Sequence, residues 1–125
     1  MRNFNLVDSC GWLEYVVGSA QGKKYFAPIN DLENLIVPTI CIYEVFKRIM
    51  SQQDEEEALR VVANMHLGKV VDLDSRLAVD AAQLSRTLRI PMADAIVVAT
   101  AHLVSATIWT QDEHFKDMKS VKFLG

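Results

Sequence analysis

The sequence predicts an α/β fold in which a central parallel β-sheet of about five strands is flanked by helices on both faces. Short apolar stretches that suit buried strands alternate along the chain with longer segments of helical periodicity. Hydrophobic residues make up 50% of the 125 residues, and glycine and proline are scarce. A chain of this length and composition can bury a core, so we expect a single domain over residues 1–125.

Each element of this prediction follows from local sequence signals. The apolar stretches expected to form strands are residues 4–7, 34–37, 69–72, 107–110 and 121–124. Capping residues mark helix starts, and these helices are expected to run from Ser9 beyond Tyr15, from Thr39 to about Met50, from Asp54 to about His66 and from Asp74 to about Leu88. The remaining helical segments are residues 21–33, which are more polar, an apolar helix that begins at Pro91, and a short helix after Asp112.

A small set of acidic residues stands in unusually apolar surroundings. Asp94 is the only formal charge in residues 90–111, and Asp8 and Glu44 are isolated in apolar segments in the same way. Asp112 directly follows the run that contains Asp94. A carboxylate that ionises in such surroundings costs free energy unless a positive group meets it, and no Lys or Arg is close in sequence to Asp8 or Asp94. A shared metal ion is the simplest partner, and carboxylates suit the hard cations Mg²⁺ and Mn²⁺.

The predicted fold places two of these acids at one edge of the sheet. Asp8 and Asp112 directly follow expected strands, and ligands of parallel sheets gather beyond the strand C-termini. Each acid also has a local explanation: Asp8 and Asp112 as caps, Glu44 as a partner of Arg48, and Asp94 as a first-turn acid that suits the helix dipole. One shared metal site is nevertheless more economical than a separate coincidence for every acid.

Composition and targeting signals narrow the function further. The net charge is −3, which argues against a generic nucleic-acid binder but not against one that works through metal ions. Cys10 and Cys41 lie near two of the acids, so a zinc site with a cysteine ligand is an alternative, although buried thiols more often serve packing. His102 is expected to be packed and hydrogen-bonded. The N-terminal apolar stretch is too short for a signal peptide, and the run after Asp94 is too short to span a bilayer, so we expect a cytoplasmic protein away from membranes.

Four segments together resemble the PIN domain and, more narrowly, the VapC-type toxins of bacterial and archaeal toxin–antitoxin pairs. They are VDSCGWLEY at the end of the first strand, CIYEVFKR in a helix, RIPMADAIVVATA, and TQDEHF after a strand. No single motif is specific, but four of them in this order and at these spacings are. The resemblance spans essentially the whole chain. The resemblance implies an endoribonuclease that depends on Mg²⁺ or Mn²⁺ and usually forms a homodimer. A metal-activated water would cleave RNA and leave a 5′-phosphate and a 3′-hydroxyl.

The resemblance also implies roles for individual residues. The acids that would bind one or two metal ions and carry catalysis are Asp8, Glu44, Asp94 and Asp112. The hydroxyl groups expected to line the site are those of Ser9 and Thr110. Some relatives carry a further acid two residues after the last one, and His114 occupies that place here. We therefore keep the adjacent Glu113 as a candidate accessory residue and expect a second metal ion to bind weakly.

The family further implies a cognate VapB-type antitoxin as partner. Its C-terminal segment would cross a groove near the early helices and insert a basic side chain among the acids. The aromatic residues expected to form the apolar part of this groove, unless they are core residues, are Trp12, Tyr15 and Phe46. The basic residues that are candidates for contacting RNA phosphates are Lys47, Arg48, Arg86, Arg89 and Lys116.

Other functions fit the sequence less well. A phosphate-accepting receiver domain would need paired acids after the first strand, but Ser9 follows Asp8. A non-catalytic RNA-binding or interaction module on the same fold would have no need of the intact acids. A PIN-like nuclease of RNA processing, or one that acts on DNA outside any toxin pair, remains an alternative, and an adjacent gene for a small DNA-binding protein would decide against it.

Overall fold

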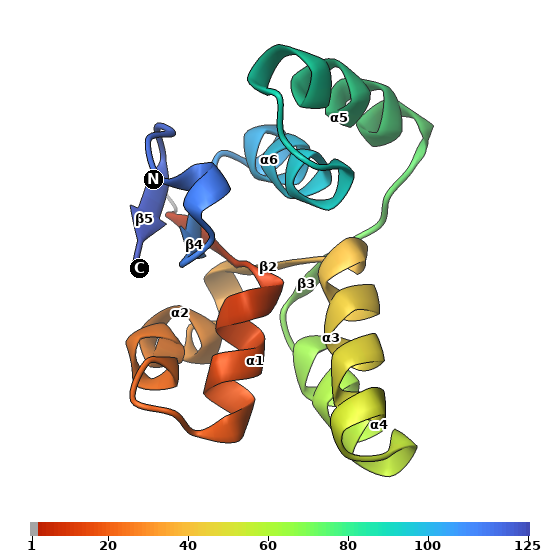
Figure 1. The fold of residues 1–125 in the computed structure, drawn as a ribbon, viewed down its shortest axis with the longest axis vertical. Coiled ribbons are helices and arrows are strands. Elements are labelled where there is room, and N and C mark those ends of the chain that lie inside the picture. The colour runs from red at the N-terminus through yellow and green to blue at the C-terminus, as the bar shows by residue number, and fades with distance from the viewer. Residues whose placement is uncertain (1–2) are drawn as a thin grey trace.

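The computed structural model describes residues 3–125 and has a five-stranded parallel sheet at its centre (Figure 1). The strands lie in the order β3-β2-β1-β4-β5, and every neighbouring pair is parallel. Their bounds are Phe4–Val7 for β1, Leu35–Pro38 for β2, Lys69–Val71 for β3, Ala106–Thr110 for β4 and Val121–Phe123 for β5. All five predicted strands are therefore confirmed to within about a residue at each end.

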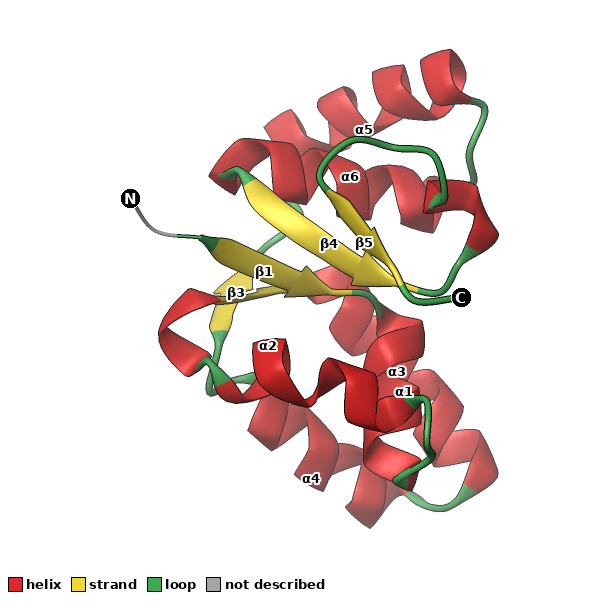
Figure 2. Ribbon diagram, turned by 90° about the vertical axis from the view of Figure 1, so that its left-hand side faces the viewer, coloured by secondary structure: helices red, strands yellow, loops and turns green. Residues whose placement is uncertain are grey.

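Helices cover both faces of this sheet, as the sequence predicts. The helices are α1 Ser9–Val17, α2 Phe26–Asn30, α3 Thr39–Gln52, α4 Glu55–Met65, α5 Ser75–Leu88 and α6 Met92–Val104, with 3₁₀ turns η1 Gly22–Tyr25, η2 Leu32–Asn34 and η3 Glu113–Phe115. Helices α5 and α6 lie on one face, and α1 to α4 lie on the other (Figure 2). The predicted fold class is confirmed.

The strand order reverses at β1, which pairs with β2 on one side and with β4 on the other. Leu6 of β1 stands beside Ile36 of β2 and Ile108 of β4, and all three are buried. These apolar side chains hold the middle of the sheet through hydrophobic burial. The C-termini of β1 and β4 consequently emerge side by side at the switch point, the place where open α/β sheets bind ligands.

The capping signals identify some helix starts correctly and misplace others. Asp54 and Asp74 are the predicted caps of α4 and α5, and their side chains accept hydrogen bonds from backbone N–H groups of the first turn. The prediction that Ser9 caps α1 is wrong, because Asp8 is the N-cap and accepts the N–H of Ser9 at 2.8 Å. Thr39 does not cap α3 either, since its hydroxyl accepts the N–H of Leu73 at 3.2 Å. Both hydroxyls are taken by contacts outside the helix they were expected to cap.

The single helix predicted over residues 21–33 is also wrong. That segment breaks into η1, α2 and η2. Gly22 packs so tightly that a Cβ there would lie 2.2 Å from the carbonyl oxygen of Glu14, and Pro28 offers no N–H to a helix. The segment is therefore held against the end of α1 in short turns instead of running on as one amphipathic helix.

Helix α6 is the central buried helix, and residues 95–101 are buried without interruption. The buried stretch ends there, so His102 and Leu103 are exposed, and the prediction that His102 is packed and hydrogen-bonded is wrong. Among residues 3–125 no single helix has both the length and the apolar character to cross a membrane; α5 and α6 meet that criterion only as a pair bent by 115°.

Candidate metal centre

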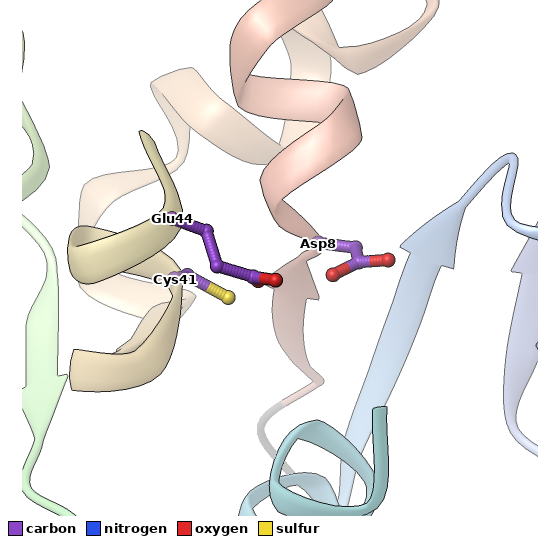
Figure 3. Close-up of side chains that lie close together, drawn as sticks. All are labelled: Asp8, Cys41 and Glu44. Atoms are coloured by element: carbon purple, nitrogen blue, oxygen red, sulfur yellow. The ribbon is translucent and has the colours of Figure 1, made fainter. Parts of the chain in front are cut away.

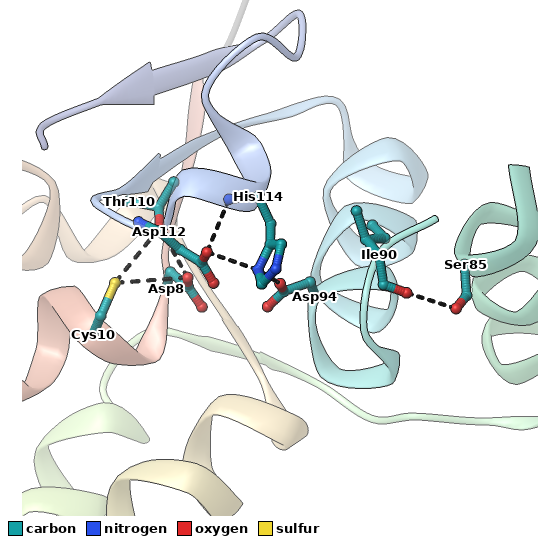
Figure 4. Close-up of polar contacts among 8 residues, drawn as sticks. All are labelled: Asp8, Cys10, Ser85, Ile90, Asp94, Thr110, Asp112 and His114. Atoms are coloured by element: carbon teal, nitrogen blue, oxygen red, sulfur yellow. Dashed lines mark hydrogen bonds and ion pairs between the residues drawn. The ribbon is translucent and has the colours of Figure 1, made fainter. Parts of the chain in front are cut away.

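The fold brings Asp8, Glu44, Asp94 and Asp112, here called the carboxylate cluster, to the switch-point edge of the sheet. Asp8 follows β1 and Asp112 follows β4, while α3 contributes Glu44 and α6 contributes Asp94. Asp8, Asp94 and Asp112 lie together in Figure 4, and Glu44 faces Asp8 in Figure 3. Burial, and then repulsion between these acids, raises the pKa values of Asp8, Glu44 and Asp94. Side chains from four distant segments therefore share one site, and the expectation that they lie together holds in the structure.

Asp8 is the most buried member of the cluster, at 4% exposure. Its Oδ1 accepts the N–H of Ser9, and its Oδ2 accepts the Thr110 hydroxyl at 2.9 Å and, at 3.6 Å, the thiol of Cys10 (Figure 4). These donors favour the ionised form, but burial outweighs them and raises the pKa of Asp8 above its usual range. Hydrogen bonds thus hold Asp8 in a fixed orientation, but no positively charged side chain within residues 3–125 pairs with it.

Glu44 reaches the cluster from α3 and is only half-buried. Its Oε1 accepts the hydroxyl of Ser9 at 2.9 Å, and no ion pair with Arg48 forms within 4.0 Å in the part of the chain that the structure describes. Burial, followed by repulsion from Asp8, raises the pKa of Glu44 even though the Ser9 hydrogen bond lowers it. The local explanation of Glu44 as a solvated partner of Arg48 therefore does not describe the structure.

Asp94 and Asp112 meet across the imidazole of His114. The Nδ1 atom of His114 lies 2.8 Å from Oδ2 of Asp94 and 2.9 Å from Oδ1 of Asp112 (Figure 4). Burial and then repulsion from Asp112 and Asp8 raise the pKa of Asp94 to about 7, against the opposing effect of His114. The start of α6 is fixed nearby, because the Ser85 hydroxyl donates to the carbonyl of Ile90 at 2.7 Å, just before the helix.

The donor set of the cluster fits a divalent metal ion. Among residues 3–125, no Lys or Arg side chain lies within ion-pair distance of any of the four acids, and the imidazole of His114 is the one basic group in contact with them. Two groups of ligand atoms each fall within 4.8 Å of one another: Asp8 with Cys41 and Glu44, and Asp94 with Asp112 and His114. Such spacing lets one ion contact all three atoms of a group, and divalent cations are the usual partners of clustered carboxylates.

Three further side chains lie near the cluster: Cys10, Cys41 and His114. From the sequence, the cysteines were considered only for an alternative zinc site, and His114 only as the residue in the place of a further acid. Figure 3 shows the Cys41 thiol directed toward the space between Glu44 and Asp8. His114 had a usable signal, since it stands two residues after Asp112, whose Oδ1 accepts the His114 N–H at 2.9 Å. Glu113, kept as a candidate accessory residue, is exposed and makes no hydrogen bond to the cluster within residues 3–125.

The hydroxyl groups expected to line the site do so. Thr110 is fully buried and donates to Asp8, while its oxygen accepts the N–H of Asp112 at 3.0 Å. Ser9 donates to Glu44. Each hydroxyl thereby fixes one or two acids of the cluster, which explains why a polar side chain is buried at the end of an apolar strand.

The candidate RNA contacts are all exposed, and two of them lie beside the cluster. Lys47 and Arg48 line a shallow pocket on α1 and α3 together with Ser9 and Glu44. The other candidates, which are exposed at the end of α5 and after η3, are Arg86, Arg89 and Lys116. Among the candidate RNA contacts, the two that share a pocket with an acid of the cluster are therefore Lys47 and Arg48, both on α3.

The predicted antitoxin groove needs one correction. Trp12 is 2% exposed and belongs to the core, so it cannot line a surface groove. It lies on the inner face of α1, a placement that the helical spacing of apolar residues does not distinguish from a groove position. Tyr15 and Phe46 are partly exposed, and Tyr15 contributes with Phe26 to a groove between α1 and α4.

Comparison with known proteins agrees with this architecture. Residues 6–121 match the PIN domain family. A toxin–antitoxin complex from Klebsiella pneumoniae aligns with a TM-score of 0.82 and 17% identity over 97% of this chain and 98% of that chain. DNA-bound VapBC from Salmonella typhimurium aligns at 0.75 and 14% identity over 99% and 100% of the two chains. A sarcin–ricin-loop-cleaving VapC toxin from Mycobacterium tuberculosis aligns at 0.75 and 16% identity over 91% and 94%.

The parallel sheet with acids gathered at its switch point defines an α/β protein of the PIN type. The match over most of its length shows that the chain belongs to the PIN domain family. At these low identities the solved structures establish a shared fold. A search of curated proteins found no significant match.

Proposed function

We propose that this protein is a metal-dependent endoribonuclease and the toxin of a VapBC-type toxin–antitoxin pair. The observation that carries the proposal is the carboxylate cluster, in which four acids face one another without a Lys or Arg partner among the described residues. Such a cluster repels RNA phosphates on its own. It becomes a phosphate-binding site only when divalent cations offset its charge.

The residues that would hold Mg²⁺ or Mn²⁺ are Asp8, Glu44, Asp94 and Asp112. A bound ion of this kind supplies Lewis acidity and lowers the pKa of water, which suits hydrolysis of a phosphodiester to a 5′-phosphate and a 3′-hydroxyl. Thr110 and Ser9 keep Asp8 and Glu44 in position before substrate arrives, so little reorganisation is needed when RNA binds. The four acids act as one unit, so losing any of them disables the site.

The substrate and partners follow from the surroundings of the cluster. Lys47 and Arg48 stand beside Glu44 and can hold the RNA backbone through its phosphates. Several solved structures with this fold are VapBC complexes, and this likeness supports a VapB-type antitoxin as partner. The proposal also treats residues 1–125 as one nuclease domain that forms a homodimer and works in the cytoplasm, where its RNA lies.

RNA cleavage by purified protein freed of antitoxin tests the proposal. Total cellular RNA is incubated with Mg²⁺, Mn²⁺ or EDTA, and new 5′ ends are sequenced. We expect cleavage at few sites, dependence on metal, and 5′-phosphate products. Asp94→Asn should abolish cleavage and relieve growth arrest, whereas Asp80→Asn, on an exposed position of α5, should leave both unchanged.

Three results would contradict this function. Cleavage by folded Asp94→Asn at the rate of the unaltered protein would remove the acids from catalysis. A folded protein that cleaves no RNA with any metal, but binds it, would instead be a non-catalytic RNA-binding module. Cleavage of DNA in preference to RNA would point to a PIN-like nuclease outside toxin pairs.

A further inference from the structure

Each half of the carboxylate cluster contains one donor atom that is softer than oxygen. In one half, Nδ1 of His114 lies within 3 Å of a carboxylate oxygen from each of Asp94 and Asp112. In the other half, the Cys41 thiol stands with Asp8 and Glu44, and the ligand atoms of that group lie within 4.8 Å of one another (Figure 3).

The two donor side chains differ in burial: Cys41 is buried, and His114 is about half exposed. Cys41 is fully buried and belongs to the hydrophobic core. Its Sγ nevertheless lies within 4.8 Å of carboxylate oxygens of both Asp8 and Glu44, close enough to share a metal ion with them. The His114 side chain is about half exposed (51%), so its position is not imposed by core packing and is set by the two acids it contacts.

We infer that this centre is built for a transition-metal ion such as Mn²⁺, Co²⁺ or Zn²⁺ in preference to Mg²⁺, with His114 Nδ1 and Cys41 Sγ as ligands beside the acids. The inference rests on the proposed metal-dependent function and adds the class of ion. Mg²⁺ takes oxygen ligands almost exclusively, whereas imidazole nitrogen and thiolate sulfur favour transition metals.

The chemistry of each ligand is specific. His114 binds as the neutral imidazole through Nδ1, which replaces its contacts to the two carboxylates with contacts to the ion they share. Cys41 binds as the thiolate, so its thiol proton is released to solvent when the ion enters. Asp94 and Asp112 supply the oxygen ligands in one half, and Asp8 and Glu44 supply them in the other.

Binding measurements on a matched pair of variants test the histidine. Titration calorimetry with Mn²⁺ and with Mg²⁺ should show tighter binding of Mn²⁺ to the unaltered protein. His114→Asp replaces the nitrogen donor by oxygen and should lower the ratio of Mn²⁺ to Mg²⁺ affinity by about tenfold or more. His102→Gln, an exposed imidazole at the other end of α6, should leave the ratio unchanged.

Spectroscopy on the loaded protein identifies the donor atoms directly. Pulsed electron paramagnetic resonance of the Mn²⁺ protein should show coupling to ¹⁴N, which His114→Asp abolishes and His102→Gln retains. The Co²⁺ protein should show a sulfur-to-metal charge-transfer band that disappears in Cys41→Ser and persists in Cys10→Ser. Bound Mn²⁺ without ¹⁴N coupling, or bound Co²⁺ without the sulfur band, overturns the corresponding ligand.

The outcomes separate this inference from the proposed function. If Mn²⁺ and Mg²⁺ bind with equal affinity and RNA is cleaved, the nuclease stands and the selectivity for transition metals falls. If neither ion binds in a manner that Asp8→Asn and Asp94→Asn weaken, the metal-dependent function falls with it.

Discussion

The Thr110 hydroxyl donates to Oδ2 of Asp8 at 2.9 Å and thereby ties the C-terminus of β4 to that of β1. The same oxygen accepts the N–H of Asp112, so one buried side chain fixes two acids of the carboxylate cluster. Val7 of β1 is in register with Trp109 of β4, which places the strand ends level. Thr110 therefore couples the stability of the sheet to the geometry of the site.

Replacing Thr110 tests this coupling. Thr110→Val keeps the shape but leaves the Asp112 N–H without its acceptor and removes a donor from Asp8. We expect a loss of about 1–3 kcal/mol in the free energy of unfolding, measured by urea denaturation, and weaker Mn²⁺ binding. Thr110→Ser keeps the hydroxyl and should retain most of both. Equal metal affinity in Thr110→Val and the unaltered protein would show that the hydroxyl does not position the acids.

In the metal-free protein, the free energy of unfolding should fall as pH rises. The pKa of Asp94 is about 7 in the folded protein, against an ordinary value of 3.8, because burial and neighbouring acids disfavour the charge. A raised folded pKa means that the protonated acid is stabilised on folding, so this contribution is complete below about pH 4 and is lost as pH rises through about 7. The pKa values of Asp8 and Glu44 are raised as well, which gives the same sign.

Thermal unfolding in EDTA checks this dependence. Between about pH 5 and about pH 8 we expect the Tm of the metal-free protein to decline, with a smaller decline in Asp94→Asn, which stays neutral. Saturating Mn²⁺ should flatten the profile, because the ion compensates the ionised acids. A Tm that rises over this range in EDTA would contradict the electrostatic description of the cluster.

Much of this fold is predictable from sequence because the strands and most helices carry short-range signals. The apolar composition of β2 and of the buried part of α6 predicts both elements, and Asp54 and Asp74 cap their helices through local hydrogen bonds. The prediction of one helix over residues 21–33 is wrong because tight packing on α1 imposes the conformation of this segment, and no local pattern encodes that packing.

The candidate site was partly predictable for a related reason. Asp8 and Asp94 stand out because an isolated charge in an apolar run needs a partner, and the partner lies far away in the sequence. His114 and Cys41 give only weak signals, a place two residues after Asp112 and a place three residues before Glu44, because a histidine among polar residues and a cysteine on an apolar helix face are ordinary. Their proximity to the acids exists only after β1, α3 and β4 have been placed side by side.

Gly22 offers a test of the packing that broke the predicted helix. Gly22→Ala would place a methyl group 2.2 Å from the Glu14 carbonyl oxygen, and backbone atoms cannot move away cheaply. We expect destabilisation of about 1–3 kcal/mol or more, measured by chemical denaturation. Gly18→Ala is the control: its φ of +73° is strained for alanine, but nothing lies within 4 Å, so the loss should be near 1 kcal/mol, about the cost of the left-handed conformation. A larger loss in Gly18→Ala than in Gly22→Ala would show that backbone strain, rather than packing, dominates here.

The basic residues on α3 should control RNA binding without affecting metal binding. Lys47 and Arg48 line the pocket beside Glu44, so their reversal to glutamate removes two phosphate contacts and adds repulsion. We expect Lys47→Glu/Arg48→Glu to weaken RNA binding at least about tenfold at low salt and to reduce the salt dependence of the affinity. Lys23→Glu/Lys24→Glu makes the same change in net charge at the two exposed lysines of η1, so a general charge effect would weaken RNA binding in both variants alike. If Mn²⁺ affinity is unchanged and only the α3 variant loses RNA binding, the substrate path runs over α3 into the carboxylate cluster. Equal losses would show a general charge effect and would contradict this path.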